Sequence, residues 1–151
     1  MLKNIKNDLL YLLNMVEGIE KILIYSKKFK SAEELFEFND QINFNAILNL
    51  FGMLGENIGK VSEELKNKHN KISWREIKDF RNKIVHDYVN IDVFIVFSII
   101  KNDLLELKLK IENIISSELK QGIFDIQEFN VSQDSMYYKH INFKKISDFK
   151  N

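Results

Sequence analysis

One short segment, residues 81–88, holds three side chains that could act together on a phosphate ester. Arg81, His86 and Tyr88 lie within eight positions, on or just past the expected end of a short helix. An arginine fork can bind a phosphate and stabilise charge that develops on its oxygens. A histidine can move a proton near neutral pH, and a tyrosine offers a phenol that can be modified. The segment therefore predicts a phosphate-binding acid–base site.

The spacing of the two cationic residues restricts how they could cooperate. Five residues turn a regular helix by about 140°, so Arg81 and His86 are not neighbours on one face. They converge if the arginine reaches around the helix, if the helix ends near Val85, or if a two-fold dimer places two copies in one groove. An isolated Arg-x4-His pair is most often only a pair of solvated charges, so the wider sequence has to decide.

Composition indicates a single globular domain with no general affinity for nucleic acid. The 151 residues are 45% hydrophobic, which is enough for a substantial core. Lys plus Arg and Asp plus Glu number 22 each, whereas a general nucleic-acid coat protein would be strongly basic. Any contact with nucleic acid must therefore come from a local basic patch. Around the motif, basic residues outnumber acidic ones: Lys71, Arg75, Lys78, Arg81 and Lys83.

Several kinds of site and location are not expected. The sequence has no cysteine, which excludes disulfides and thiolate metal sites and suits a reducing cytoplasm. No His-x3-His pair or carboxylate–histidine cluster has ligand spacing, so we expect no metal and no cofactor. Residues 1–25 carry Asp8, Glu17 and Glu20, which argues against a secretory signal. The apolar run 93–100 is too short to span a bilayer, so we expect a cytoplasmic protein without membrane contact.

Helical spacing of apolar residues dominates the first four-fifths of the chain. Apolar stripes step by three or four residues over 5–23, 47–65 and 97–114. Capping boxes at Ser31 and Ser73 predict a short helix near 32–38 and a helix from Trp74 to about His86. Asp40 and Asp92 are expected to cap the long helices that follow them. We predict an all-α fold, an antiparallel four-helix bundle with a short extra helix.

Two features indicate close packing between helices or between subunits. Gly52, Gly55 and Gly59 lie near one face of the third helix, where each costs about 1 kcal/mol relative to alanine. They could admit another backbone within the bundle, which we favour slightly, or across a dimer. The segment 93–100 is apolar nearly all round. A subunit interface or a central position in the bundle would each explain that pattern.

The character of the chain changes after Ser117. The last residues lose the helical stripe and become rich in polar and aromatic residues. Segments 124–129 and 141–143 are compatible with short strands or with an extended, docked arm. We therefore predict a helical domain over 1–117 and a C-terminal extension of unknown role over 118–151.

The motif and its surroundings resemble the HepT-like branch of the HEPN ribonuclease toxins. The likeness covers roughly residues 5–115, and an ordered set of matches is far more specific than the motif alone. The matching segments are Gly55-Glu56, Trp74-Arg75-Glu76-Ile77, Arg81-Asn82, His86-Asp87-Tyr88, Asp92 and Asn102-Asp103-Leu104. Asp87 departs from the family's usual glutamate, and the tail after Ser117 has no counterpart.

The resemblance implies a homodimeric, metal-independent endoribonuclease toxin. Carried over by position, Arg81 and His86 are the catalytic pair and Asn82 is a supporting neighbour that orients them. Tyr88 is the residue to which a minimal nucleotidyltransferase antitoxin transfers AMP. If the helix breaks at Asp87, we expect the Tyr88 hydroxyl at the rim of the same pocket, near Arg81. The alternative is a non-catalytic HEPN-like helical binding partner of a nucleotidyltransferase. The presence of both Arg81 and His86 favours the enzyme.

Overall fold

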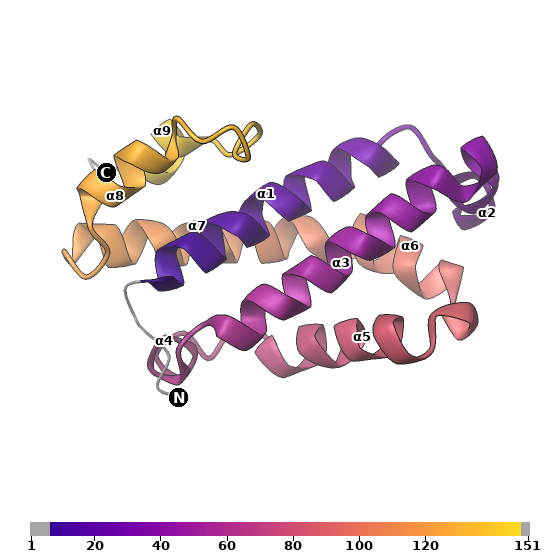
Figure 1. Ribbon diagram of the computed structural model, residues 1–151, viewed down its shortest axis with the longest axis horizontal. Coiled ribbons are helices and arrows are strands. Elements are labelled where there is room, and N and C mark those ends of the chain that lie inside the picture. The colour runs from indigo at the N-terminus through magenta and orange to yellow at the C-terminus, as the bar shows by residue number, and fades with distance from the viewer. Residues whose placement is uncertain (1–6, 149–151) are drawn as a thin grey trace.

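The computed structural model describes residues 7–148 as a helical bundle (Figure 1). Its elements are α1 (Asp8–Ser26), α2 (Ala32–Glu37), η2 (Phe38–Gln41), α3 (Ile42–Lys60), α4 (Glu63–Lys68), α5 (Trp74–His86), η3 (Tyr88–Asn90), α6 (Val93–Asn102), α7 (Leu104–Lys120), α8 (Ile126–Ser132) and α9 (Phe143–Ile146). Over residues 7–148 no strand is present, and the all-α prediction is confirmed. Ile5 and the outer ends of the predicted units 1–117 and 118–151 lie outside the described residues.

The core of the bundle is built from α1, α3, α5 and the consecutive pair α6–α7. Helix α3 packs along both α1 and α5, and α1 also packs along α7. The inward faces carry the apolar stripes, whose fully buried members include Leu12, Val16, Ile19, Ile47, Leu54, Ile58 and Ile111. Burial of these stripes, rather than helix propensity, supplies most of the stability of such helices.

Two predicted long helices are interrupted in the structure. The predicted last helix is divided at Asp103 into α6 and α7. Helix α3 ends at Lys60 instead of reaching Leu65, because Val61 adopts an extended conformation. The backbone N–H of Ser62 then donates to the buried Asp8 carboxylate at 2.9 Å, and its hydroxyl donates to the same group at 2.5 Å. This pair of bonds fixes the turn and lets Ser62 cap α4.

The predicted N-caps have mixed outcomes. Ser31 accepts from the N–H of Glu34 and caps α2, while Asp92 accepts from the N–H groups of Phe94 and Ile95 and caps α6. The prediction for Asp40 is wrong, because that residue lies in a left-handed turn of η2 and α3 begins without a side-chain cap.

Gly55 is the point of closest approach between α3 and α5. A Cβ built on Gly55 would lie 2.1 Å from Cβ of Arg81, far inside contact distance, whereas one on Gly52 or Gly59 would meet nothing within 4 Å. Phe51 and Phe80 make an edge-on ring contact one turn away, with centroids 5.3 Å apart. Packing within the bundle, the favoured explanation, therefore holds for Gly55 and not for the other two glycines.

The outer face of α6 is exposed. Phe94 and Ile95 are 58% and 50% accessible, while Val96 and Ile100 are buried. A central position for this helix within the single chain is therefore wrong. In the next helix, Leu105 and Leu109 of α7 are also exposed. These two leucines are four residues apart, so they lie on one face of α7.

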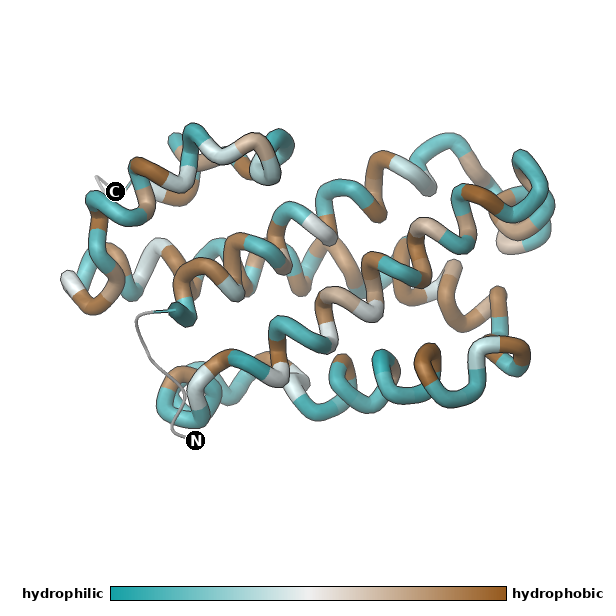
Figure 2. Tube along the Cα trace, viewed as in Figure 1, coloured by the Kyte–Doolittle hydropathy of each residue, from teal (hydrophilic) through white to brown (hydrophobic). Residues whose placement is uncertain are grey.

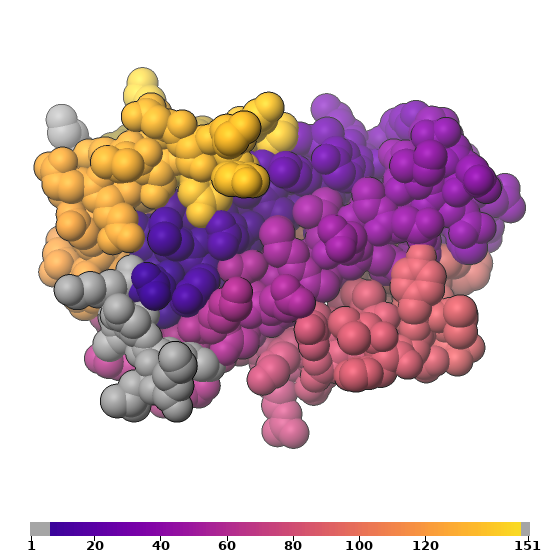
Figure 3. All heavy atoms as spheres, in the orientation of Figure 1, coloured from indigo at the N-terminus to yellow at the C-terminus, as the bar shows by residue number. Residues whose placement is uncertain are grey.

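The C-terminal extension is helical and lies against α1 and α7. Helices α8 and α9 replace the predicted short strands, and Figure 3 shows the extension covering part of α1. Its buried apolar residues join the common core: Phe124, Phe129, Ile141, Phe143 and Ile146. The predicted boundary at Ser117 falls in the last turns of α7, and the division into 1–117 and 118–151 stays a prediction.

Polar contacts also hold the extension against two buried carboxylates. The backbone N–H of His140 donates to Glu17 of α1 at 2.7 Å, and its ring Nδ1 lies 2.6 Å from the same group. Lys145 pairs with Glu112 of α7 at 3.3 Å. Burial and, to a smaller extent, the Glu17 charge raise the pKa of the Tyr138 hydroxyl. That hydroxyl donates to Asn14 at 2.5 Å.

Candidate active site

Helix α5 is fixed at its start by a buried tryptophan. The Trp74 ring is buried, and its indole N–H donates to the carbonyl of His69 at 3.0 Å. The predicted capping box is absent, because the Ser73 side chain makes no cap hydrogen bond to the first turn. Anchoring by Trp74 therefore sets where the helix begins.

The end of α5 confirms the predicted break at Asp87. The helix stops at His86, and Asp87 has φ −144° and ψ 44°, outside the helical region. The N–H of Asp87 still closes the last turn on the carbonyl of Lys83 at 2.8 Å. Its carboxylate accepts from the Asn90 amide at 2.7 Å, which holds the short η3 turn that follows. Tyr88 is the first residue of that turn.

The Arg81 side chain lies across the contact between α5 and α3. Its Nη2 is 3.2 Å from a carboxylate oxygen of Glu56, and its Nη1 donates to the amide oxygen of Asn82 at 3.1 Å. The Nε atom is buried without a hydrogen-bond partner among the described residues. The side chain is 28% exposed, so the guanidinium stays within reach of an external anion.

His86 occupies the last position of α5 and is exposed to solvent. Within residues 7–148 its ring makes no hydrogen bond or ion pair, and none joins it to Arg81 in the same chain. Both ring nitrogens are therefore available to an external group. A free imidazole of this kind can serve as a general acid or base once a substrate is placed against it.

The Tyr88 hydroxyl is held by Asn45 of α3. The side chain is 47% exposed, as expected for a residue that another enzyme must reach. However, its hydroxyl donates to the Asn45 amide oxygen, not to any group near Arg81. Asn45 precedes Glu56 by eleven residues, which is about 16 Å of helix. The predicted proximity of this hydroxyl to Arg81 is therefore wrong within one chain.

The exposed side of α5 is strongly polar, with a surplus of basic groups near the motif. In Figure 2 most of this helix is coloured hydrophilic. Arg75 is almost fully exposed and lies 4.0 Å from Asp79, a distance at the limit of an ion pair. Lys71, Lys78 and Lys83 are also exposed. The local basic patch predicted from the sequence is thus accessible to an anionic polymer.

The partners of the motif residues do not follow from the motif itself. Glu56 holds Arg81 and Asn45 holds Tyr88, and both partners come from α3. Glu56 could have been suspected, because Gly55-Glu56 is one of the segments that resemble the HepT-like family. Only the antiparallel register of α3 and α5 shows that Gly55 and Glu56 lie beside Arg81.

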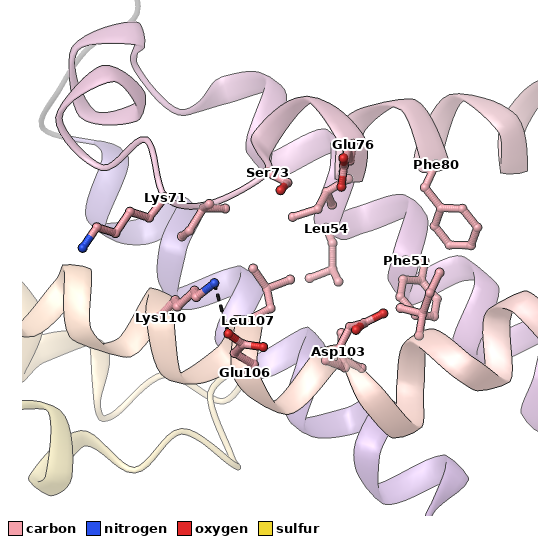
Figure 4. Close-up of a pocket in the computed structure, with 14 residues that line it drawn as sticks. Phe51, Leu54, Lys71, Ser73, Glu76, Phe80, Asp103, Glu106, Leu107 and Lys110 are labelled. Carbon is pink, nitrogen blue, oxygen red and sulfur yellow. Dashed lines mark ion pairs between the residues drawn. The ribbon is translucent and has the colours of Figure 1, made fainter.

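A separate groove of about 380 Å³ opens between α5 and α7 (Figure 4). Phe51 and Leu54 of α3 line its floor, while Glu76 and Asp103 lie on its rim. None of the motif residues Arg81, His86 and Tyr88 lines it. The groove is therefore not the motif site. The motif residues lie on the exposed surface, which a polymeric substrate can reach.

Residues 7–148 contain neither a cluster of metal ligands nor a membrane-spanning helix. No group of three or more histidine and acidic side chains is arranged to hold a metal ion. No helix in this part of the chain has both the length and the apolar character needed to cross a bilayer.

Comparison with known proteins identifies the family. The sequence profile of the family described as "Ribonuclease HepT-like" matches residues 15–114, about two-thirds of the chain. The chain belongs to the HepT-like ribonuclease family. The resemblance drawn from residues 81–88 and their surroundings is confirmed, as is the expectation of a ribonuclease.

Individual relatives agree with this assignment. A protein named "Probable ribonuclease HepT" from Thermococcus cleftensis is 28% identical over 104 residues, covering 69% of this chain and 92% of the relative. A protein provisionally named an RNase from Caldanaerobacter subterraneus is 27% identical over 79 residues, covering 52% of this chain and 70% of the relative. Another such protein, from Methanocaldococcus jannaschii, is 26% identical over 105 residues, covering 70% and 84%. No solved structure gives a significant match.

Proposed function

We propose that this HepT-like chain is a metal-independent endoribonuclease toxin of a toxin–antitoxin system. The observation that carries the proposal is the motif at the end of α5, where an accessible Arg81 guanidinium and an exposed, unengaged His86 ring accompany the family match. The cysteine-free sequence suits action on RNA in the cytoplasm. The experiment that tests the proposal is cleavage of RNA by the purified chain in EDTA, with the variants given in the Discussion.

The proposed reaction uses the 2′-hydroxyl of RNA as the nucleophile. A histidine removes the proton of that hydroxyl, its oxygen bonds to phosphorus, and the bond from phosphorus to the 5′-oxygen breaks. A second histidine protonates the departing oxygen, so the products are a cyclic phosphate and a 5′-hydroxyl. Arg81 stabilises the negative charge that grows on the phosphate oxygens. Asn82, which accepts from Nη1 of Arg81, helps to orient it.

A homodimer would supply the two histidines. Arg81 and His86 make no contact in one chain, and a two-fold groove is one of the arrangements that can unite them. The exposed apolar side chains of Phe94, Ile95, Leu105 and Leu109 form the surface that we assign to the partner subunit. Burial of such side chains in an interface contributes a favourable free energy of about 25 cal/mol per Å² of apolar area, which stabilises the dimer.

Light scattering at micromolar concentration should therefore give twice the chain mass of 17.9 kDa. Phe94→Glu combined with Leu105→Glu should yield monomers, because two charges would be buried without partners in the interface. Val131→Glu, on an exposed part of α8, is the matched control and should stay dimeric. A monomer mass for the unaltered chain would argue against a shared catalytic groove.

We further propose that a minimal nucleotidyltransferase antitoxin silences the toxin by transferring AMP to Tyr88. The phenol oxygen would attack the α-phosphorus of ATP, and pyrophosphate would leave. Tyr88 is two residues from His86, so the added phosphate and base would lie at the His86 end of α5 and obstruct RNA by charge and size. The exposure of the ring supports access by a partner enzyme.

Tyr88→Phe should remain toxic when the antitoxin is co-expressed, because it lacks the oxygen that accepts AMP. Mass spectrometry should find one or more AMP groups on Tyr88 of the unaltered chain and none on the variant. Tyr137→Phe, which changes an exposed tyrosine of the extension, is the control and should still be silenced. If the antitoxin neutralises Tyr88→Phe fully, inhibition works by binding alone.

A further inference from the structure

We infer that Glu56 is a competing anion at Arg81: its carboxylate engages the guanidinium at rest, and an RNA phosphate must displace it. The inference rests on the proposed function, since it takes Arg81 to be the phosphate-binding residue. It adds a residue of α3 that tunes how readily the site accepts RNA.

Gly55 and Glu56 together hold the whole Arg81 side chain. The missing side chain of Gly55 leaves the space that the arginine stem fills, because an added Cβ would lie 2.1 Å from Cβ and 2.5 Å from Cγ of Arg81. Glu56, the next residue, binds the head of the same side chain, with 3.2 Å between its Oε1 and Nη2. The stem is fixed by packing, whereas the head is held by a charge interaction that can be exchanged.

The donors that remain on Arg81 are few. A guanidinium has five N–H groups. One on Nη1 is used by Asn82, one on Nη2 by Glu56, and the Nε–H is buried. Carboxylate and phosphate oxygens bind this fork in the same way, so Glu56 takes a position that a phosphate oxygen would take. A phosphate bound to the remaining donors would lie beside the Glu56 charge, and repulsion would oppose it.

The pairing also ties the Arg81 head to α3 and not to His86. The contacts of Asn45 with Tyr88 and of Gly55 with Arg81 show that α3 and α5 run antiparallel. Glu56 binds Nη2 of Arg81, whereas the ring of His86, the last residue of α5, makes no hydrogen bond to that side chain among the described residues. Displacement of Glu56 frees the Nη2 donor of the guanidinium for a phosphate oxygen.

The ion pair is weak enough to be displaced. The Glu56 side chain is 58% exposed, and the contact to Arg81 is made through one oxygen. Exposed pairs of this kind change an equilibrium constant by about fivefold at most. Glu56→Gln keeps the size of the side chain and removes its charge, so it should tighten RNA binding by about two- to fivefold.

Fluorescence anisotropy with a 2′-O-methyl oligoribonucleotide, which binds but cannot be cut through its 2′-oxygen, measures this effect. The proteins compared are the unaltered chain, Glu56→Gln, Arg81→Ala, the double variant, and Glu33→Gln as a charge-matched control on α2. Glu56→Gln should lower Kd, and Glu33→Gln should not. The gain in RNA affinity caused by Glu56→Gln should vanish when Arg81 is also replaced by alanine, because Glu56 acts through that arginine. In cleavage assays the easier displacement should appear as a lower KM for Glu56→Gln.

The outcomes separate the inference from the proposed function. If Arg81→Ala binds RNA as tightly as the unaltered chain, Arg81 does not hold the phosphate of bound RNA and the inference fails, whereas the proposed ribonuclease is tested separately by cleavage in EDTA. If Arg81→Ala weakens binding but Glu56→Gln leaves Kd unchanged or raises it, only the role of Glu56 is overturned. A gain that persists in the double variant also overturns it, because the effect would then be general electrostatics.

Discussion

Replacing His86 or Arg81 with alanine should lower the rate of RNA cleavage by about 10²- to 10⁴-fold. The expected loss for His86→Ala follows from the removal of a positioned acid–base group, which typically contributes that much. Loss of a preorganised donor to developing charge, as in Arg81→Ala, typically costs about 10²- to 10³-fold. Initial rates on a defined oligoribonucleotide in EDTA measure both effects.

The controls for this prediction lie on the same helix. Lys78→Ala removes an exposed positive charge from α5 without touching the motif, and its rate should change far less. His86 is exposed, so His86→Ala should keep the helical circular dichroism of the unaltered chain. Full activity in either His86→Ala or Arg81→Ala would refute the assignment of that residue.

Phe129→Ala should lower the free energy of unfolding by about 3–5 kcal/mol, the usual range for truncating a buried phenylalanine. Phe129 is 1% exposed, and its ring lies 5.1 Å from that of Phe143, centroid to centroid. Both residues belong to the same core as α1 and α7, so the cavity would loosen the extension from the bundle. Urea unfolding followed by circular dichroism provides the measurement.

Met136→Ala is the matched control for the extension. Met136 is 77% exposed, so its truncation leaves no cavity and should change the unfolding free energy very little. Equal unfolding midpoints for Phe129→Ala and Met136→Ala would show that the packing of α8 contributes nothing to stability.

The long helices could be predicted because their stripes extend over many turns. Residues 8–26 and 42–60 repeat apolar positions often enough to fix both the type of element and its buried face. The extension could not be predicted in this way. Helices α8 and α9 have only 7 and 4 residues, too few turns for a period to emerge. Their conformation depends on contacts with distant groups such as Glu17 and Glu112.

The location of the candidate site was predictable, but the contacts that its side chains make with α3 were not. The end of α5 at His86 follows from local sequence, and the exposure of Tyr88 follows from that break. The partners Glu56 and Asn45 depend on how α3 is aligned against α5, which no local pattern reveals. That alignment also explains why the Tyr88 hydroxyl lies far from Arg81.

The most direct test of ribonuclease chemistry uses the purified chain, free of any partner, in EDTA with two oligonucleotides of one sequence. One is ordinary RNA and the other carries 2′-O-methyl groups throughout. We predict that the ordinary RNA is cut to products with a cyclic phosphate and a 5′-hydroxyl, and that the methylated RNA stays intact. Failure to cut the ordinary RNA would contradict the account and favour a non-catalytic partner of a nucleotidyltransferase. Equal cutting of both would contradict the 2′-hydroxyl mechanism.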